Sequence, residues 1–423
     1  MHRLFTPAGA SEDGLVEHAQ DKTAPKGLLF YHAREGKPLA TPWQVANIRA
    51  SMVASHFLPE GCVLDCACGS GIQLAAYAAT LQRPVLGVEL DHGRAQASAV
   101  NLRTVARHQR ATDADWFASS VVVAGDGTDP KGVFHAVGGV QKVAFLHLDP
   151  ARPRNSRTHA LEEMQPSLSA VLEAWAPFFE ADKQPALLLD LSPRLTDAQR
   201  HEVEQKVEAI WPGVERTWEW TSRGRGRVDR LALWLGGVAS AKVVRRFVRV
   251  PPSLGDRPVV LETAEHPSRQ EALRHPPQRG EFVSILDAAL MESGLMEAWL
   301  KGVLPDSLRR WGVVSGRRPQ LHHDRMLDLK AGDQWLVQAS GRVVEVMHLS
   351  LDDSTVDEVV KTAIEHKFSS VKLRMDLSPE LQPRLQGSID RQLRRRGGER
   401  NGFLALHPEG EALLLCVSQT DSF

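Results

Sequence analysis

The chain has 423 residues, of which 42% are apolar and 24% are charged, the balance of a folded globular protein. This length exceeds what one ordinary hydrophobic core holds, so we expect two or three domains. The net charge of −1 excludes a polycation, so any nucleic-acid surface has to be a local patch offset by acidic residues elsewhere.

Patterns of secretion and membrane insertion are missing from the sequence. We see no apolar signal-peptide core near the start, and no run of about 18 apolar residues predicts a membrane span. Cys62, Cys66 and Cys68 lie too close together for a disulfide framework, which favours a reducing, cytoplasmic compartment. A zinc site at Cys66 and Cys68 is an alternative to small side chains beside a turn. No second Cys/His pair has matching spacing, so no metal is expected.

Residues 1–55 predict a polar, helical N-terminal segment. Thr41 can cap a helix there, and Pro42 can take its first position. Val45, Ile48 and Met52 then recur at helical spacing.

Residues 56–240 predict a parallel sheet covered on both faces, because short, continuous apolar strands alternate with helices. The strands are expected at 62–66, 84–90, 120–124, 142–148, 185–191, 215–221 and 228–235, and the helices at 71–81, 92–108, 158–181 and 195–210. The loop at 222–227 predicts that the last two strands form an antiparallel pair.

Residues 241–329 predict a proline-containing connector followed by an amphipathic helix at 281–301. Residues 330–423 predict a small α+β domain. Its strands are expected at 334–338, 343–349, 370–375, 402–407 and 412–418, and its helices at 355–366 and 379–395.

A glycine-rich turn follows the first strand of the predicted sheet, with the sequence Asp65-Cys66-Ala67-Cys68-Gly69-Ser70-Gly71. Its glycines let the backbone approach a ligand and adopt positive φ, and the next helix presents its N-terminus to negative groups. We expect a cofactor to contact Asp65, Ala67, Gly69 and Gly71; the alternative is an ordinary strand-to-helix turn. The spacing G-x-G-x-x-G is absent, which argues against NAD or FAD.

Carboxylates end the next two strands. Glu89 is placed to accept hydrogen bonds from ribose hydroxyls, whereas Asp91 is expected to cap the following helix. Asp126 is placed to accept from an adenine amino group, and its alternative role is that of a turn residue before Gly127.

The fourth strand ends in Asp149-Pro150-Ala151-Arg152, at the edge where such sheets bind ligands. This sequence resembles the Asp/Asn-Pro-Pro-aromatic motif of methyltransferases that act on exocyclic amino nitrogens. The resemblance implies that the Asp149 side chain and the Pro150 carbonyl accept amino protons and orient the nitrogen lone pair. Arg152 can stack on a base or clamp a phosphate. The alternative is that Asp149 and Pro150 only form a turn; His147 is interpreted as a core histidine.

Together these motifs resemble class I S-adenosylmethionine (SAM)-dependent methyltransferases, in particular a bacterial and archaeal family with a C-terminal THUMP-like domain. The resemblance implies an α/β fold with a seven-stranded Rossmann-like sheet over 56–240. It also implies an N-terminal helical segment over 1–55, a connector over 241–329 and a THUMP-like α+β domain over 330–423. Two features depart from the family: Ala67 replaces a glycine, and Lys372-Leu373-Arg374 replaces a more continuous basic stretch.

The resemblance implies SAM as the cofactor and a purine amino nitrogen of tRNA or rRNA as the methyl acceptor, similar to enzymes that methylate N2 of guanine. Three basic clusters favour an RNA partner, although solvated surface is the alternative for each. They comprise Arg223, Arg225 and Arg227; Arg309, Arg310, Arg317, Arg318, His322, His323 and Arg325; and Arg384, Arg391, Arg394, Arg395, Arg396 and Arg400.

Two other functions stay open. The chain can be a methyltransferase acting on a small molecule or a protein, or a non-catalytic RNA-binding protein on a methyltransferase scaffold. The intact set Asp65, Glu89, Asp126 and Asp149 argues against the second.

Overall fold

The computed structural model describes residues 2–17, 21–34, 40–152, 159–180, 183–224, 226–265, 277–311, 318–396, 398–410 and 412–419. The chain divides into two compact units. The first unit comprises residues 1–219, 230–244 and 250–257, and the second unit comprises residues 220–229, 245–249 and 258–423.

The N-terminal segment is mainly extended, so the prediction of a helical segment over 1–55 is wrong for most of its length. It contains the strands β1 (Arg3–Phe5), β2 (Leu15–Glu17) and β3 (Tyr31–Ala33) before the single helix α1 (Trp43–Ala54). β1 pairs antiparallel with β6 (Val121–Ala124), and β2 pairs antiparallel with β3. The backbone N–H and C=O groups of these strands form hydrogen bonds with neighbouring strands and not within a helix.

Helix α1 starts one residue later than predicted and takes its cap from elsewhere. Pro42 is the N-cap and has no side chain to offer, so the prediction of Thr41 as N-cap and Pro42 as first helical residue is wrong. The first two amides instead donate to side chains upstream: Trp43 N–H to Asp21 Oδ2 at 2.9 Å and Gln44 N–H to Thr23 Oγ1 at 3.4 Å.

The seven predicted strands of the first unit are confirmed within one or two residues. Besides β6 they are β4 (Cys62–Asp65), β5 (Val85–Glu89), β7 (Val143–Leu148), β8 (Ala186–Leu191), β9 (Arg216–Ser222) and β10 (Arg230–Gly236). Their order is β1-β6-β5-β4-β7-β8-β10-β9. The pairs from β6 to β8 are parallel, and β10 runs antiparallel to β8. The two strands that flank the loop at 222–227, β9 and β10, are neighbours in the sheet.

The helices of this unit are confirmed with one exception. The predicted ones are α2 (Ile72–Leu81), α3 (His92–Gln109) and α7 (Asp197–Ile210), and two unpredicted ones are α4 (Asp115–Ala118) and α5 (Pro130–Val137). The single helix predicted over 158–181 is wrong. The described part contains a 3-10 turn (Leu161–Glu163), α6 (Leu168–Trp175) and a second 3-10 turn (Ala176–Phe178). Pro166 and Pro177 lack the N–H that an unbroken helix needs.

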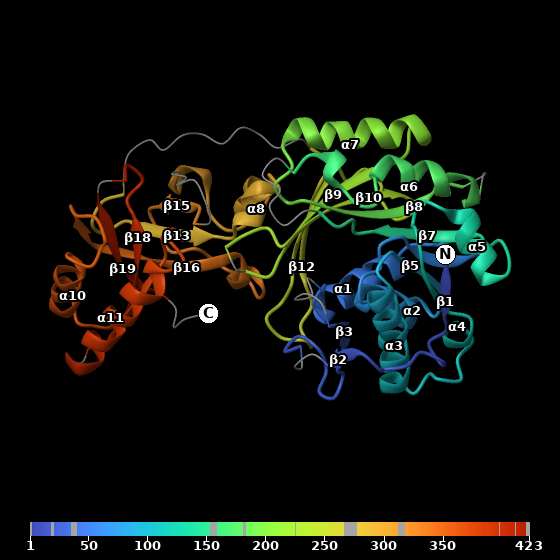
Figure 1. Cartoon of the computed structure of the whole chain (residues 1–423). Helices are drawn as coiled ribbons and strands as arrows, with labels where there is room; N and C mark the ends of the chain where they lie inside the picture. The colour runs from blue at the N-terminus through green and yellow to red at the C-terminus, as the bar shows by residue number, and fades with distance from the viewer. Residues whose placement is uncertain are drawn as a thin grey trace. The chain divides into compact units, whose positions relative to one another are not determined.

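Helices cover both faces of the sheet in the first unit. Figure 1 shows α1, α2 and α3 on one face and α6 and α7 on the other. Tyr77 of α2 and Trp175 of α6 are each fully buried against their face of the sheet. This double covering explains why the central strands are apolar throughout.

The second unit is built on a seven-stranded sheet of order β14-β15-β13-β16-β19-β18-β17. Its strands are β13 (Phe282–Leu286), β14 (Arg309–Trp311), β15 (Gln320–His323), β16 (Val337–Met347), β17 (Phe368–Leu373), β18 (Arg400–Leu406) and β19 (Leu413–Ser418). The antiparallel pair β11 (Arg245–Arg249) and β12 (Val259–Thr263) also belongs to this unit.

The predicted amphipathic helix at 281–301 is wrong. Its first part is β13, which pairs with β15 on one side and β16 on the other, and only the short helices α8 (Ala288–Glu292) and α9 (Met296–Leu300) follow. A short apolar run fits a buried strand as well as a helix, and here the neighbouring strands decide.

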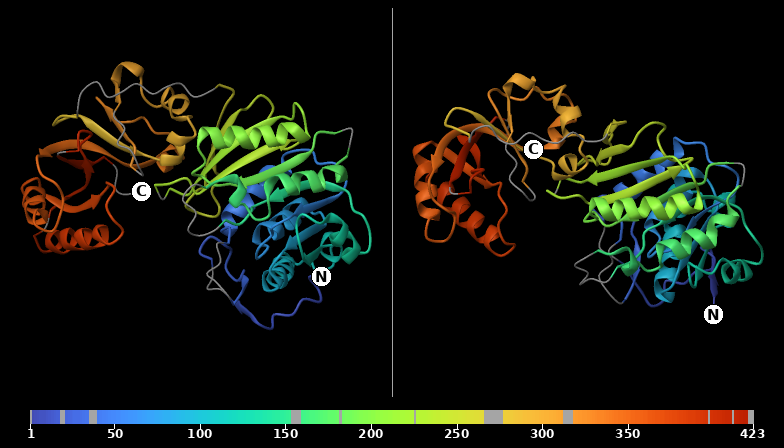
Figure 2. Two further views of the ribbon diagram at one scale, coloured as in Figure 1. Left: turned by 45° about the horizontal axis from the view of Figure 1, so that its top comes forward. Right: turned by 90° about the horizontal axis from the view of Figure 1, so that it is seen from above.

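The sheet of the second unit takes strands from both sides of the predicted boundary at 329/330, so the connector and the C-terminal region share one structure. The strands predicted at 334–338 and 343–349 form one long strand, β16, after a 3-10 turn (Asp333–Leu336). The helices α10 (Val356–Glu365) and α11 (Leu381–Arg396) are confirmed and pack on one sheet face (Figure 2).

Candidate cofactor and substrate site

Four parallel strands of the first unit end side by side where the predicted site residues lie. The order β6-β5-β4-β7 places the residues after these strands along one edge of the sheet. Glu89 pairs in register with Ala124, and Asp65 pairs with His147. The topology therefore brings Asp126, Glu89, Asp65 and Asp149 to a common edge, as the strand pattern predicted.

The turn between β4 and α2 uses its two glycines differently. Gly69 has a φ of 55°, and a Cβ added to it would meet no atom within 4 Å, so the space beside it is open. Gly71 is the N-cap of α2 with a φ of 73°, and a Cβ there would lie 2.1 Å from the Ser98 hydroxyl oxygen. Gly69 leaves room for a ligand, whereas Gly71 lets α2 approach α3.

Asp65 acts inside the turn and is shielded from solvent. Its side chain is only 1% exposed, and its Oδ1 accepts the Ala67 N–H at 3.1 Å. Its Oδ2 lies 2.8 Å from Nδ1 of His147. The Asp65 carboxylate therefore fixes the conformation of the turn. Ala67 contributes only its backbone N–H to the bond with Asp65, so this bond does not require a glycine at this position.

Glu89 ends β5 with both carboxylate oxygens on backbone amides. Oε2 accepts from Gly69 N–H at 2.9 Å and Oε1 from Asp91 N–H at 3.0 Å. Burial raises the pKa of Glu89, and these two hydrogen bonds oppose the shift. Asp91 caps α3 by accepting the Arg94 N–H at 2.8 Å, as predicted. Leu90 between them is 78% exposed.

Asp126 is exposed just beyond the end of β6. Its Oδ1 accepts from both the backbone N–H and the hydroxyl of Thr128, each at 2.8 Å. This is the local turn bonding that the alternative interpretation expected. It engages only Oδ1, so Oδ2 has no hydrogen bond to the described residues.

Asp149 lies beyond the end of β7 in contact with a cation. Its Oδ2 is 3.2 Å from Nη1 of Arg230, whose Nη2 donates to the Thr41 hydroxyl at 2.9 Å. Burial raises the pKa of Asp149, whereas the charge of Arg230 lowers it. Pro150 is buried behind it. Thr41, predicted as a helix cap, thus supports the partner of Asp149.

Arg152 presents two buried donors without an acceptor. Its Nε and Nη2 have no hydrogen-bond partner among the described residues. Burial lowers the pKa of Arg152, and the charges of Asp149, Asp190 and Glu163 counter that shift. Nε and Nη2 form one side of the guanidinium fork, so they match a ligand with two adjacent acceptors.

A buried row of charges underlies this edge. His147 of β7 lies between Asp65 and Asp190 of β8, and Arg49 of α1 binds both oxygens of Asp190, one at 2.6 Å from Nη2. Burial lowers the pKa of His147, but the two carboxylates outweigh it and raise the pKa to about 9. The pKa of Asp190 is lowered despite burial, chiefly by the charge of Arg49.

Sequence reasoning missed three of these residues. Asp190 carried a signal, because it is a carboxylate inside the apolar strand Leu187-Leu188-Leu189-Asp190-Leu191. Arg49 interrupts the helical apolar pattern of α1, and Arg230 follows the predicted loop. Neither pattern predicts which carboxylate the arginine binds, because these ion pairs depend on how α1 and β10 lie relative to the other strands.

The three basic clusters differ in the structure. Many arginines of the first two are paired with acids: Arg223 with Asp229 at 3.0 Å, and Arg309 with Glu297 at 2.8 Å. His322 and His323 are fully buried, so the prediction that they face phosphates is wrong. Arg225 and Arg317 lie outside the described residues.

The third cluster is the exposed one. On α11, Arg391, Arg394, Arg395 and Arg396 are exposed, and no carboxylate of the described chain lies within ion-pair distance of them. Arg384, about two helical turns before Arg391 on the same helix, forms an ion pair with Asp353.

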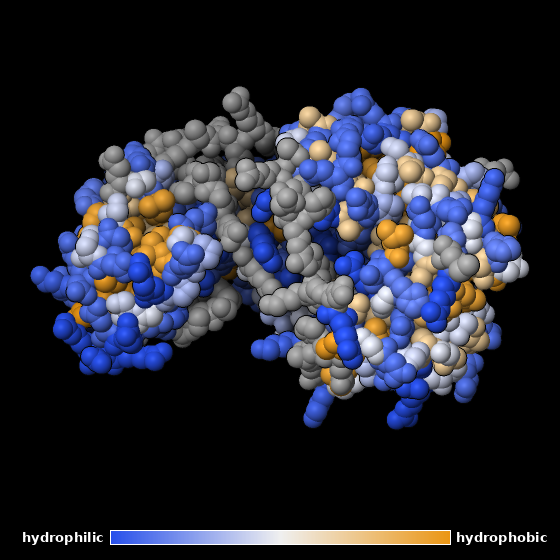
Figure 3. Space-filling view, viewed as in Figure 1, coloured by the Kyte–Doolittle hydropathy of each residue, from blue (hydrophilic) through white to orange (hydrophobic). Residues whose placement is uncertain are grey.

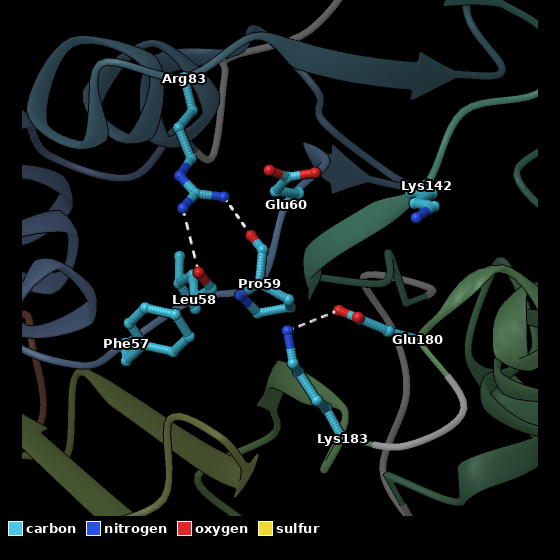
Figure 4. A pocket seen from close by; sticks show the side chains of 8 residues that line it. All are labelled: Phe57, Leu58, Pro59, Glu60, Arg83, Lys142, Glu180 and Lys183. Atoms are coloured by element: carbon cyan, nitrogen blue, oxygen red, sulfur yellow. Dashed lines mark hydrogen bonds and ion pairs between the residues drawn. The ribbon is translucent and has the colours of Figure 1, made fainter.

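A pocket of about 360 Å³ lies at the other edge of the first unit's sheet, where Arg83 and Lys142 precede β5 and β7. Figure 4 shows its polar groups facing one another: Arg83 donates to the carbonyls of Leu58 and Pro59, and Lys183 lies 2.9 Å from Glu180. These groups are already paired, and the predicted site lies at the opposite ends of the strands.

The described residues lack both a metal-binding cluster and a membrane-spanning helix. They contain no group of three or more His, Cys, Asp or Glu side chains arranged to hold a metal ion. Within the same residues, no helix combines the length and the apolar character needed to cross a bilayer.

No protein family and no curated protein matches the sequence. Among solved structures, the chain is similar to a candidate class I SAM-dependent methyltransferase from Listeria monocytogenes (14% identity, 53% of this chain, 70% of that chain, TM-score 0.36). It is also similar to the human methyltransferase 10 domain containing protein (14%, 47%, 85%, TM-score 0.32). A third is a candidate rRNA methylase from Clostridium thermocellum (11%, 44%, 94%, TM-score 0.29). The function of this chain therefore has to come from the residues of its own site.

Proposed function

We propose that the chain is a SAM-dependent methyltransferase that transfers a methyl group to an exocyclic amino nitrogen of a purine in RNA. The observation that carries the proposal is the common edge of four parallel strands, with Asp126, Glu89, the glycine turn and Asp149 in that order along it. A THUMP-like, RNA-binding role of the C-terminal region is part of the proposal.

The groups at this edge suit the chemistry of SAM. The open space beside Gly69 admits the methionine part close to the N-terminal turn of α2. Glu89 keeps lone pairs for ribose hydroxyls beyond its two backbone bonds, and Oδ2 of Asp126 is available to an adenine amino group. The exposed Leu90 offers an apolar face for the adenine ring.

SAM, when bound, supplies an electrophilic methyl group on a sulfonium. Asp149 would act on the substrate side: Arg230 occupies its Oδ2, and its Oδ1, which has no hydrogen bond to the described residues, can accept an amino N–H. That bond, with one to the Pro150 carbonyl, turns the nitrogen lone pair toward the methyl carbon. Asp149 or water would take up the proton that the methylated nitrogen releases, and the raised pKa of Asp149 favours this uptake.

The RNA part of the proposal is supported by the exposed arginines of α11. Figure 3 shows a strongly hydrophilic surface over this helix, and Arg391, Arg394 and Arg395 recur at helical spacing along it. Unpaired arginines on a chain of net charge −1 suit phosphate contacts whose strength falls steeply with salt.

Arg152 supports a substrate with two adjacent acceptors. Its buried Nε and Nη2 suit either two oxygens of a phosphate or the two acceptors on one edge of a base. A base stacked on its guanidinium plane would leave both N–H groups without an acceptor. Of the two roles that the sequence leaves open for Arg152, we therefore favour edge-on pairing with acceptors over stacking on a base.

The test is transfer of tritiated methyl from SAM to total RNA from cells that lack this protein, followed by mass spectrometry of the nucleosides. The expected result is one methylated purine nucleoside that the untreated RNA lacks. RNA from cells that contain the protein is the control, because its sites are already methylated and should take up little label.

Other outcomes point to the alternatives. Label in protein or small molecules, with none in RNA, would contradict the RNA substrate and favour the other methyltransferase function. Absence of SAM binding by calorimetry, with retained RNA binding, would favour a non-catalytic RNA-binding protein.

A further inference from the structure

His147 is held between two carboxylates from neighbouring strands. Its Nδ1 lies 2.8 Å from Oδ2 of Asp65, and its Nε2 lies 3.3 Å from Oδ2 of Asp190. The three side chains are 1–2% exposed. The edge of the Tyr77 ring covers the imidazole, with 5.5 Å between ring centroids.

This geometry requires a proton on each ring nitrogen. A neutral imidazole carries one N–H, so its other nitrogen would point a lone pair at a carboxylate oxygen while shielded from solvent. An imidazolium donates to both carboxylates and cancels part of their charge. The raised pKa of His147 agrees with this geometric reason.

The bond to Asp65 connects the histidine to the cofactor turn. Asp65 uses its second oxygen to accept the Ala67 N–H, and two residues later the Gly69 N–H binds Glu89. His147 also precedes Asp149 by two residues on β7. The His147 side chain thus contacts the carboxylate that fixes the glycine turn, and it belongs to the strand that leads to the substrate-facing Asp149.

We infer that His147 is a positioning residue: as an imidazolium it orients the Asp65 carboxylate against the Ala67 N–H and so shapes the turn that binds SAM. It touches neither cofactor nor substrate, and it differs in this from Asp149. The inference rests on the proposed cofactor site, and SAM affinity tests it without reference to the methyl acceptor.

The charged groups around His147 come from the neighbouring strands β4 and β8 and from helix α1. Arg49 of α1 neutralises Asp190 from the far side, so the pull on His147 from Asp190 is partly satisfied, whereas the described residues place no cation other than His147 within ion-pair distance of Asp65. Loss of the imidazolium should therefore affect Asp65 more than Asp190. Among the described residues, Asp65, Asp190 and Tyr77 contact His147, and Asp149 interacts with its charge. Arg49 acts on Asp190 and Tyr77, and Glu219 acts on Arg49 and Tyr77.

Two neutral variants separate the two bonds. His147→Asn places an amide N–H near the position of Nδ1 and can still donate to Asp65, whereas His147→Gln places it near Nε2 and can donate only to Asp190. We expect His147→Asn to weaken SAM binding by less than about threefold and His147→Gln by about tenfold or more, since one lost buried hydrogen bond to a charged group is worth about that factor. Calorimetry with SAM and with S-adenosylhomocysteine measures both.

The melting temperature of each variant is the control for a merely structural role: SAM affinities are compared at a temperature where both variants are folded, so that unfolding does not account for a loss of binding. Equal SAM affinities for the two variants, or a larger loss in His147→Asn, would overturn the proposal. If the variants do not fold, ¹⁵N spectra of histidine-labelled wild type decide. Imidazolium shifts for His147 at pH 7.5 that move on SAM addition support the inference, and a neutral tautomer or an unmoved signal sinks it. Wild type that binds SAM but modifies no RNA leaves this inference intact and refutes the substrate proposal.

Discussion

A buried histidine of the first unit, His147, and one of the second unit, His323, have surroundings that are opposite in kind. His147 of the first unit lies between Asp65 and Asp190, and its pKa is raised to about 9. His323 of the second unit lies between the Ser284 hydroxyl at 2.8 Å and the Arg325 carbonyl at 2.5 Å. Burial lowers the pKa of His323 to about 4.

The difference shows that burial alone does not separate a site residue from a core residue. His323 is neutral because a hydroxyl can donate to one nitrogen and a carbonyl can accept from the other, and Ser340 completes the row at 2.8 Å from Ser284. His147 is charged because both partners only accept. A charged buried row costs desolvation, and it lies next to the edge where the strands end.

The largest expected effect is on catalysis at Asp149. Asp149→Ala should bind SAM normally and transfer methyl on the order of a thousandfold more slowly, because it loses both positioning and proton uptake. Asp149→Asn keeps an acceptor and should be impaired much less. Single-turnover rates check both, with Ser340→Ala of the second unit as a control that should keep the wild-type rate. A fully active Asp149→Ala would place the substrate edge elsewhere.

Stability should distinguish the charged row from the neutral one. Arg49→Met leaves Asp190 buried without its main cation and should cost about 3–5 kcal/mol of unfolding free energy. Ser284→Ala leaves His323 and Ser340 short of one neutral partner and should cost about 1–3 kcal/mol. Urea unfolding of the whole chain measures both, and Arg49→Lys is the intermediate variant. Equal costs would contradict the contrast between the rows.

The pH dependence of the two rows should have opposite signs. His147, with a folded-state pKa of about 9, contributes stability that is complete below about pH 6.5 and is lost as the pH rises through 9. His323, with a folded-state pKa of about 4, contributes stability that is complete above about pH 6.5 and is lost as the pH falls through 4. Each effect is on the order of 3 kcal/mol.

Hydrogen exchange can read the two rows separately in the intact chain. After correction for the intrinsic exchange rate, protection of β7 should fall toward pH 9, and protection of β15 should fall toward pH 4. If protection of both strands fell with the same direction of pH change, the protonation state assigned to one of the two histidines would be wrong.

The smallest expected effect is on substrate binding at Arg152. Arg152→Lys keeps the charge but loses the fork, so KM for RNA should rise about tenfold while SAM affinity stays unchanged. Arg394→Lys on α11 keeps its charge, for which we propose contacts with phosphates only, and should change KM by less than twofold. Similar effects in both variants would mean that Arg152 acts only as a point charge.

The sequence predicted the parallel sheet and the position of its carboxylates well, because both follow from local patterns. Strands at 185–191 and 142–148 are continuous apolar runs, and Glu89 and Asp149 stand directly where such runs end. The positions of four acids relative to the sheet edge then follow from the parallel topology alone.

The errors arose where distant partners decide. β1 is extended because it pairs with β6 more than a hundred residues later, and β13 is a strand because β15 and β16 flank it. The ion pairs of Arg49 and Arg230 depend likewise on how separate elements meet. His147 was read as a core histidine, and only its two carboxylate partners point to a role in the site.

Helix α1 borrows its N-terminal cap from Asp21, 22 residues earlier in the chain, and from Thr23. The same helix carries Arg49, whose guanidinium neutralises Asp190 deep in the first unit. A cleavage that released the segment before α1 would therefore fray the helix end and loosen a cation two turns further on. The first two dozen residues, although remote from the site in sequence, therefore contribute to the stability of the ion pair between Arg49 and Asp190.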